Sequence, residues 1–362
     1  MTSVLISGAG VAGPTLAYWL ARHGVEATVV ERGAAPRSSG NPVDVRGPGW
    51  AVANRMGIVP QLRAAATQAT AMLLVDAGGR ARARIPMPAT RGNEVELPRG
   101  DLAALLFDAA RADAEFVWDD TITALAPDAG GVDVTFERMA PRRFDFVVGA
   151  DGLHSTVRRL AFGPERDFVH YLGLYVATVV LGSDEGTDII LHNTPGRLVS
   201  IHPARGAALA AFIFRSAPVT GFDHRDPTQH KQIVMRAYAG AGWRVPALLE
   251  RVAAADDLYF DSVSAVRLES WSRGRIGLLG DAASCVSLFG DGSSMAMAGA
   301  ETLATALAAD PAEGFARYEA AHRRLVGPKQ RRVGRSAGML VPKTRLGLAA
   351  RDLAARAVLA RG

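Results

Sequence analysis

The sequence has a single cysteine, few aromatic residues and no long apolar segment, and each absence excludes a class of protein. Because Cys285 has no cysteine partner, the 362-residue chain can form neither an internal disulfide nor a cysteine-based metal site, which fits a cytoplasmic protein. Beyond residues 4–21, no uncharged apolar run reaches about 18 residues, so we expect no stable membrane insertion. Aromatic residues are 7% of the chain and the basic residues are scattered, so nucleic acid is not expected as a partner.

The composition that remains is that of a globular protein. Hydrophobic residues make up 49% of the chain, which is enough for one large domain or two. The formal charge of +5 favours anionic ligands. Residues 4–21 are apolar enough for a signal peptide, but they lack a basic flank and contain three glycines, so we interpret them as part of the fold.

Residues 4–33, VLISGAGVAGPTLAYWLARHGVEATVVERG, predict a strand, a helix and a second strand. The loop before the helix has the G-x-G-x-x-G pattern, in which the glycines give a tight turn, room for a pyrophosphate and close packing of helix on strand. Glu31 ends the second strand, where a carboxylate accepts hydrogen bonds from a ribose diol and disfavours a 2′-phosphate. We therefore predict that NAD or FAD, not NADP, contacts Gly8, Gly10, Val11, Ala12, Gly13, Glu31 and Arg32.

Two further apolar strands end on a glycine and an aspartate. FDFVVGADG, residues 144–152, runs to Asp151, and RIGLLGDAA, residues 275–283, runs to Gly280 and Asp281. The carboxyl ends of parallel strands form the ligand crevice of such sheets, although Asp151 could instead only cap the helix that follows. The stretch GDGSS, residues 290–294, then opens another helix, whose free N–H groups attract electron-rich atoms.

These motifs resemble those of the single-component FAD-dependent aromatic hydroxylases and monooxygenases, which have the p-hydroxybenzoate hydroxylase fold. The chain looks closest to the tetracycline-degrading and actinobacterial natural-product monooxygenases. GAGVAG with Glu31, VVGADGLHSTVR and IGLLGDAA occur in the family's order and spacing over most of the chain. The resemblance implies an α/β fold with a Rossmann-type FAD-binding domain, an inserted and mostly antiparallel β-sheet substrate domain, and a C-terminal helix.

The resemblance also assigns residues to FAD. It places Asp281 at the ribityl chain, and the N–H groups of Gly292, Ser293 and Ser294 at the N1–C2=O edge of the flavin, where a helix N-terminus stabilises the anionic reduced ring. No metal ligand is expected.

Two arginines match further family segments. Arg99 lies in LPRGDLAALL, residues 97–106, and Arg46 lies in DVRGPG, residues 44–49, so the resemblance places both near the cofactor. Either could instead be an ordinary surface or loop residue. We assign no catalytic residue, and Arg46 is the one candidate. The chain departs from the family at Ser284, where many members have His or Tyr, and in the proline-free loop 285–289 beside the flavin, which shapes its oxygen-reactive face.

The substrate half is expected to be mostly antiparallel. Residues 71–85 predict a hairpin around Gly78-Gly79, and residues 171–216 predict strands with turns at 182–186, 194–196 and 204–206. The candidate residues for the substrate pocket, each with an ordinary core or surface role as its alternative, are His192, His202, Phe212 and Phe214.

The predicted domain boundaries follow from this pattern. Residues 1–70, 93–168 and 261–328 form the FAD-binding domain, residues 71–92 and 169–260 form the substrate domain, and residues 329–362 form a basic C-terminal helical segment. Leu346, Ala350, Leu353 and Ala357 share one helical face, which we expect to pack on the body, with a membrane-surface helix as the alternative. The protein is expected to be a monomer or homodimer.

The predicted activity is that of an FAD-dependent monooxygenase. The resemblance implies that NADPH or NADH reduces the flavin, that O2 then gives a C4a-hydroperoxide, and that this species hydroxylates an electron-rich aromatic or enol-type small molecule such as a polyketide-like natural product. Three alternatives stay open: an epoxidase or Baeyer–Villiger oxygenase, a flavoprotein dehydrogenase or reductase, and a flavoprotein that binds its ligand without turnover.

Overall fold

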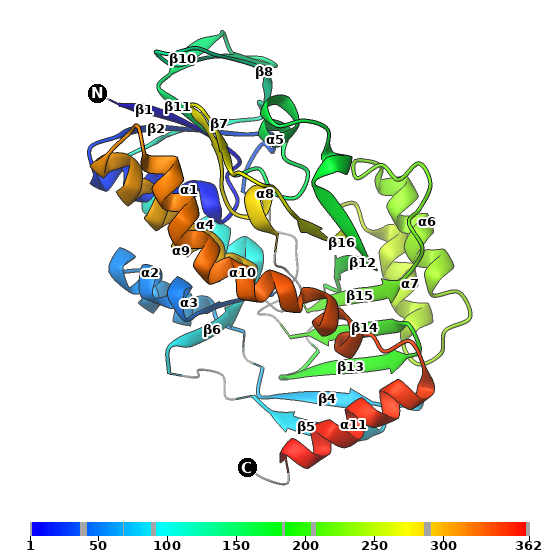
Figure 1. Cartoon of the computed structure of the whole chain (residues 1–362). Helices are drawn as coiled ribbons and strands as arrows, with labels where there is room; N and C mark the ends of the chain where they lie inside the picture. The colour runs from blue at the N-terminus through cyan, green and yellow to red at the C-terminus, as the bar shows by residue number, and fades with distance from the viewer. Residues whose placement is uncertain are drawn as a thin grey trace.

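The computed structural model of the protein describes residues 2–36, 42–67, 69–87, 92–182, 185–203, 208–285 and 291–359. Two large sheets dominate it, one in the upper part of Figure 1 and one in the lower right, with long helices running between and around them. The predicted α/β fold is confirmed.

The six-stranded sheet is built from the strands that carry the glycine motifs. Its order is β17-β18-β11-β1-β2-β7, and all neighbouring pairs except β17–β18 are parallel. The strands are apolar because α1, α4 and α9 cover one face, while a three-stranded sheet, β10-β9-β8, lies beyond the other (Figure 1). The strands are β1 (Ser3–Ser7), β2 (Glu26–Glu31), β7 (Glu115–Trp118), β11 (Phe146–Gly149), β17 (Ser272–Arg273) and β18 (Ile276–Leu278). The covering elements are α1 (Ala12–Arg22), α4 (Arg99–Ala110), α9 (Asp291–Ala309), β8 (Ile122–Pro127), β9 (Val132–Phe136) and β10 (Arg142–Phe144).

The seven-stranded sheet has the order β16-β12-β15-β14-β13-β4-β5, and only the β13–β4 pair among its described strands is parallel. The predicted hairpin is confirmed as β4 and β5, while the turn predicted at 204–206 and part of the turn at 182–186 lie outside the described residues. The predicted boundary between residues 260 and 261 falls inside β16, whose pairing with β12 assigns it to this sheet. The strands are β4 (Ala71–Val75), β5 (Ala81–Pro86), β12 (Val169–Val180), β13 (Asp188–Thr194), β14 (Arg197–His202), β15 (Leu209–Arg215) and β16 (Tyr259–Val266).

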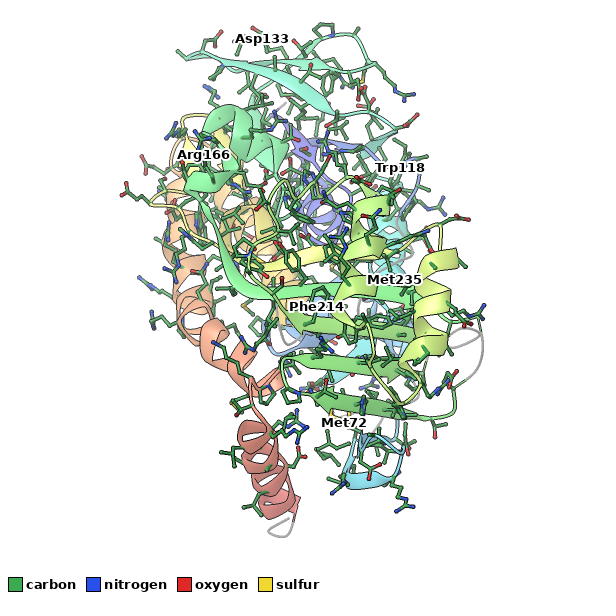
Figure 2. All side chains as sticks on the ribbon, turned by 90° about the vertical axis from the view of Figure 1, so that its right-hand side faces the viewer. Met72, Trp118, Asp133, Arg166, Phe214 and Met235 are labelled. Carbon is green, nitrogen blue, oxygen red and sulfur yellow. The ribbon has the colours of Figure 1, made fainter. Side chains whose placement is uncertain are left out.

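The two faces of this sheet have different neighbours. Helices α6 (Pro227–Ala237) and α7 (Val245–Ala254) cover its outer face, on the right of Figure 1. Figure 2 shows this face of the sheet toward the viewer, with Met235 of α6 and Phe214 of the sheet labelled. The inner face is turned toward the six-stranded sheet (Figure 1).

A short ribbon joins the two halves. Strands β3 (Val43–Arg46) and β6 (Glu94–Leu97) pair with each other, and β3 contacts α9. Helices α2 (Pro48–Met56) and α3 (Val59–Ala65) follow β3 and pack against α9 and α4 respectively.

The C-terminal segment differs from the prediction in two ways. Helix α10 (Gly314–Leu340) continues through Pro328 while packing on α9, so no element begins at residue 329. Helix α11 (Arg345–Leu359) lies against β5 and β13, but Leu346 and Leu353 are 83% and 69% exposed. The face that we expected to be buried is therefore the outer one. None of the described helices is long and apolar enough to cross a membrane.

Candidate cofactor and active site

A cavity of about 270 Å³ lies where β1, β2, β11 and β18 end. Most of the residues that the sequence motifs assign to the nucleotide line it: Gly8, Gly10, Val11, Glu31, Arg32, Arg99, Asp151 and Asp281. The lining residues that were not predicted include the titratable side chains of His154, His224, Tyr259 and Asp261. No cluster of candidate metal ligands occurs within the described part of the chain.

The three glycines of the first loop meet three different steric demands. Gly8 has a φ of +106°, and a Cβ there would lie 2.6 Å from the carbonyl oxygen of Ala150. A Cβ on Gly13 would lie 1.9 Å from the carbonyl oxygen of Gly8, so only glycine lets α1 approach the loop. Gly10 has no atom within 4 Å of its Cβ position. Its open side faces the cavity, which is the space that a pyrophosphate at the start of α1 requires.

Glu31 holds the glycine loop as well as facing the cavity. Its carboxylate accepts hydrogen bonds from the backbone N–H of Ala9 at 2.9 Å and of Gly33 at 2.8 Å. An ionised carboxylate offers about four acceptor positions, so the two oxygens can still accept the hydroxyls of a ribose.

Asp151 combines the two roles that its motif allowed. It accepts hydrogen bonds from the backbone N–H of Thr156 at 2.8 Å and Val157 at 3.1 Å, at the start of α5 (Thr156–Ala161), and from the Ser7 hydroxyl at 3.2 Å. Burial raises the pKa of its carboxyl, and hydrogen bonds from the Ser155 hydroxyl and from the backbone N–H groups of Val157 and Thr156 oppose the rise. Asp151 therefore caps α5 and ties it to the end of β1 while lining the cavity.

Arg99 and Asp281 face the cavity from two helix starts. Arg99 is the first residue of α4, and its guanidinium makes no hydrogen bond to any described residue. Asp281 begins α8 (Asp281–Ser284), directly after Gly280, which has a φ of +63°. Burial raises the pKa of Asp281, while the charge of Arg99 lowers it. A guanidinium without a hydrogen-bonding partner in the described residues fits a cofactor phosphate, and a carboxylate at a strand end fits a polyol.

The start of α9 is fixed to the β3 strand. The Ser294 hydroxyl donates to the carbonyl of Asp44 at 3.0 Å and accepts from the backbone N–H of Arg46 at 3.0 Å. A Cβ on Gly49 would lie 2.6 Å from the Ser294 Cα, so this glycine allows α2 to approach α9. Gly292 and Ser293 lie in the same first turn, while the loop residues 286–290 lie outside the described residues.

Arg46 forms ion pairs with acidic side chains of neighbouring elements. Its guanidinium lies 2.9 Å from Asp291, which also pairs with Lys329 at 2.7 Å, and 3.4 Å from Glu94. Burial raises the pKa of Asp291, but the hydrogen bonds and charges of Lys329 and Arg46 outweigh it and lower the pKa below its ordinary value. Arg46 is not among the residues that line the cavity. Its position supports a role in orienting α9 rather than a catalytic one.

The cavity is also bordered by a half-buried ion cluster that the motifs did not predict. The two ring nitrogens of His154 lie 3.0 Å from Glu165 and 3.1 Å from Asp261, and the ring stacks on His224 at a centroid distance of 4.0 Å. Burial lowers the pKa of His154, but the two carboxylates outweigh it and raise the pKa to about 9. His154 lies within the VVGADGLHSTVR motif, whereas nothing in the sequence around Asp261 indicated a ligand site.

The predicted substrate residues divide between the two faces of the seven-stranded sheet. Phe212 and Phe214 pack on Tyr238 of the outer layer, with ring centroids 5.1 and 5.7 Å apart, and His192 lies 4.9 Å from Trp243 in the same layer. These three residues belong to the core on the far side of the sheet, so the geometry does not support them as pocket residues.

His202 lies on the inner face. Its Nε2 is 2.9 Å from the Ser200 hydroxyl, and Ser200 belongs to a row of paired residues that crosses the sheet to the cavity: Tyr259, Thr178, Ala211 and Ser200. Because alternate residues of a strand share a face, His202 lies on the face of this row.

A glycine-rich loop after the first strand, a glutamate at the end of the second and two further strand ends around one cavity define a dinucleotide-binding protein of the flavoprotein class. Residues 1–321 match the model of the FAD binding domain family, and the chain belongs to this family. It is an FAD-dependent oxidoreductase of the monooxygenase type.

Its relatives and structural neighbours cover most of the chain. A flavin-dependent monooxygenase of Legionella longbeachae is 33% identical over 339 residues, which are 91% of this chain and 87% of that protein. A Mycobacterium tuberculosis protein described as uncharacterized is 40% identical over 88% of this chain and 89% of its own length. The crystal structure of the tetracycline destructase Tet(51) is 29% identical, with a TM-score of 0.88, covering 98% of this chain and 95% of that one. HpxO of Klebsiella pneumoniae, in complex with FAD and uric acid, shares the fold at 22% identity and a TM-score of 0.75, covering 98% and 92%.

Proposed function

We propose that the protein uses NADPH or NADH and O2 to hydroxylate an electron-rich aromatic or enol-type small molecule. The observation that carries this proposal is the position of the nucleotide cavity, which shares Tyr259 and Asp261 with the inner face of the seven-stranded sheet. A substrate on this face would therefore lie beside the cofactor. The names of the relatives, flavin-dependent monooxygenases, support oxygen insertion rather than simple dehydrogenation.

The residues of the cavity suit FAD along its length. Gly10 and the start of α1 would receive the pyrophosphate, Glu31 the adenosine ribose and Asp281 the ribityl chain, with Arg99 as a cation for the phosphates. The first turn of α9 would face the flavin ring, where its N–H groups stabilise negative charge. FAD, when bound, accepts electrons from the nicotinamide and supplies the oxygen chemistry.

His202 is the described residue best placed to orient a substrate. Its Nδ1 is buried without a hydrogen-bond partner in the described residues, and burial lowers its pKa to about 4. The ring is therefore neutral at physiological pH and cannot act as a strong base toward a phenol. A buried ring nitrogen without a partner is costly, so a hydrogen bond to a substrate oxygen would be favourable. We infer that His202 positions the substrate and that the substrate's own hydroxyl activates the carbon that is oxidised.

The test is the spectrum of the purified protein followed by product analysis. Under anaerobic conditions, flavin bands should bleach with NADPH or NADH and return with air, and ¹⁸O2 should label the product with one oxygen atom. A protein that stays colourless after FAD is added would exclude the proposal. Bleaching followed by an unlabelled, dehydrogenated product would assign it to the dehydrogenases, and substrate-independent nicotinamide oxidation would support ligand binding without turnover.

A further inference from the structure

Helix α11 presents an apolar stripe to solvent. Leu346 and Leu353 are 83% and 69% exposed, and with Ala350 they are spaced so that they share one side of the helix. The opposite side carries Arg351, whose guanidinium donates to the Asn193 side-chain oxygen at 2.8 Å. The helix is therefore held to the seven-stranded sheet with its leucines turned outward, at the lower margin of the molecule in both Figure 1 and Figure 2.

The C-terminal segment that includes α11 has an excess of positive charge. Residues 329–362 contain nine basic residues and one acidic residue, a net charge of +8, so residues 1–328 carry −3 of the total of +5. Lys343 and Arg345, at the start of α11, are exposed and form no ion pair with a described residue. The charge of the sequence is thus polarised, and the exposed leucine stripe lies within its cationic C-terminal segment.

We propose that α11 docks the enzyme on an anionic lipid surface. An amphipathic helix with basic residues beside an apolar stripe lies in the plane of a bilayer, with its apolar side chains among the acyl chains and its cations at the headgroups. With 15 residues and a charged face, α11 binds at the interface without crossing it.

Two other possible partners would match only one of the two features of this surface, its apolar stripe or its positive charge. A second copy of the chain would cover the leucines, but it would bring two basic segments together and they would repel each other. A nucleic acid would neutralise the charge, but it would leave the leucines in water. An anionic lipid surface covers the stripe and neutralises the cations together, and this inference does not depend on the proposed reaction.

The experiment is sedimentation of the FAD-loaded full-length protein with lipid vesicles. Vesicles that contain phosphatidylglycerol should carry the protein down at low salt, and pure phosphatidylcholine vesicles should not. Replacing the two exposed leucines (L346Q/L353Q) should abolish sedimentation at either salt concentration. Removing two charges (K343A/R345A) should weaken binding about thirtyfold, since each cation near an anionic surface contributes about a factor of five.

The matched control is Met235→Gln on α6, which removes an apolar side chain that is 39% exposed on another surface helix. It should bind vesicles like the unchanged protein, and all variants should retain bound FAD and an unchanged Tm. Failure to bind anionic vesicles would overturn the proposal. If L346Q/L353Q still bound anionic vesicles, the binding would come from charge alone and the proposal would be wrong. Binding to duplex DNA as strong as binding to the vesicles would lead to the same conclusion. Concentration-dependent dimerisation that L346Q/L353Q abolishes would assign the stripe to a second copy of the chain.

Discussion

The six-stranded and the seven-stranded sheets present side chains to a ligand in different ways. In the parallel sheet, the residues that line the cavity follow the strands, as Asp151 follows β11 and Asp281 follows β18, so their position depends on where an apolar run stops. In the antiparallel sheet, the residues come from the strands themselves, and the next residue along the chain points to the opposite face. Ser200 lies on the inner face, whereas Val199 lies in the outer core.

This difference determines how a substitution acts. A strand end tolerates change only where the backbone and the ligand leave room, because the loop is shaped by close contacts. Within a strand, residues on one face affect stability and residues on the other face contact the ligand. One face of the seven-stranded sheet is packed by α6 and α7, and the other faces the cofactor domain. The four predictions below test this separation, in order of decreasing effect.

The largest effect is expected from Phe212→Ala on the outer face. The side chain is fully buried against Tyr238, so its loss should lower the free energy of unfolding by about 4 kcal/mol, measured by urea denaturation. The KM of the folded fraction for the substrate should remain unchanged. A large change in KM with normal stability would place Phe212 in the pocket and contradict the structure.

Gly13→Ala should be the next most damaging change. The added Cβ would meet the Gly8 carbonyl at 1.9 Å, which should cost about 3 kcal/mol and prevent FAD binding. Gly10→Ala is the matched control, because its Cβ meets nothing within 4 Å. It should fold normally, as judged by the Tm of the cofactor-free protein, and weaken FAD binding only. Equal loss of stability in both variants would mean that the two glycines do not have separate roles.

The His154 cluster predicts a dependence of stability on pH. Because the pKa of His154 in the folded protein is about 9, above its ordinary value of 6.5, the stabilisation is complete below about pH 6.5 and is lost as the pH rises through about 9. The loss should be about 3 kcal/mol in the free energy of unfolding. His154→Gln should flatten the curve in this window, and Asp261→Asn should reduce its amplitude. A variant lacking His154 that keeps the full pH dependence would assign the effect to another group.

The smallest effect compares two histidines on opposite faces. His202→Phe should raise the KM for the substrate about fivefold, because one hydrogen bond contributes about 1 kcal/mol. His192→Phe, on the outer face beside Trp243, should leave KM unchanged. The measurement is the steady-state kinetics of the two variants. Equal KM values for both would show that His202 does not contact the substrate.

The sequence predicted the cofactor half in more detail than the substrate half, for a physical reason. A glycine that ends an apolar run is visible in the sequence because the conformation of Gly8 and the contact of Gly13 exclude other residues. The face to which a strand residue points is not visible when both faces are covered, since Phe212 and Ala211 are equally compatible with burial. Asp261 and Tyr259 were missed because they reach the cavity through the pairing of β16 with β12, which depends on residues distant in sequence.

The exposed face of α11 was misjudged for a related reason. Helical periodicity identifies which residues share a side, but it does not say which side meets the body. Here an arginine on the opposite side of the helix contacts the sheet, as the hydrogen bond from Arg351 to the Asn193 side-chain oxygen shows.

Helix α10 gives the molecule a rigid brace. It packs along α9 in the cofactor half, and the residues at its end are pinned to the substrate sheet: Arg215 Nε donates to the Val341 carbonyl at 2.7 Å, and the Gly196 N–H donates to the Pro342 carbonyl at 2.8 Å. A strut fastened at both ends opposes hinge opening between the two sheets. We therefore expect the two sheets to keep their relative position when ligands bind.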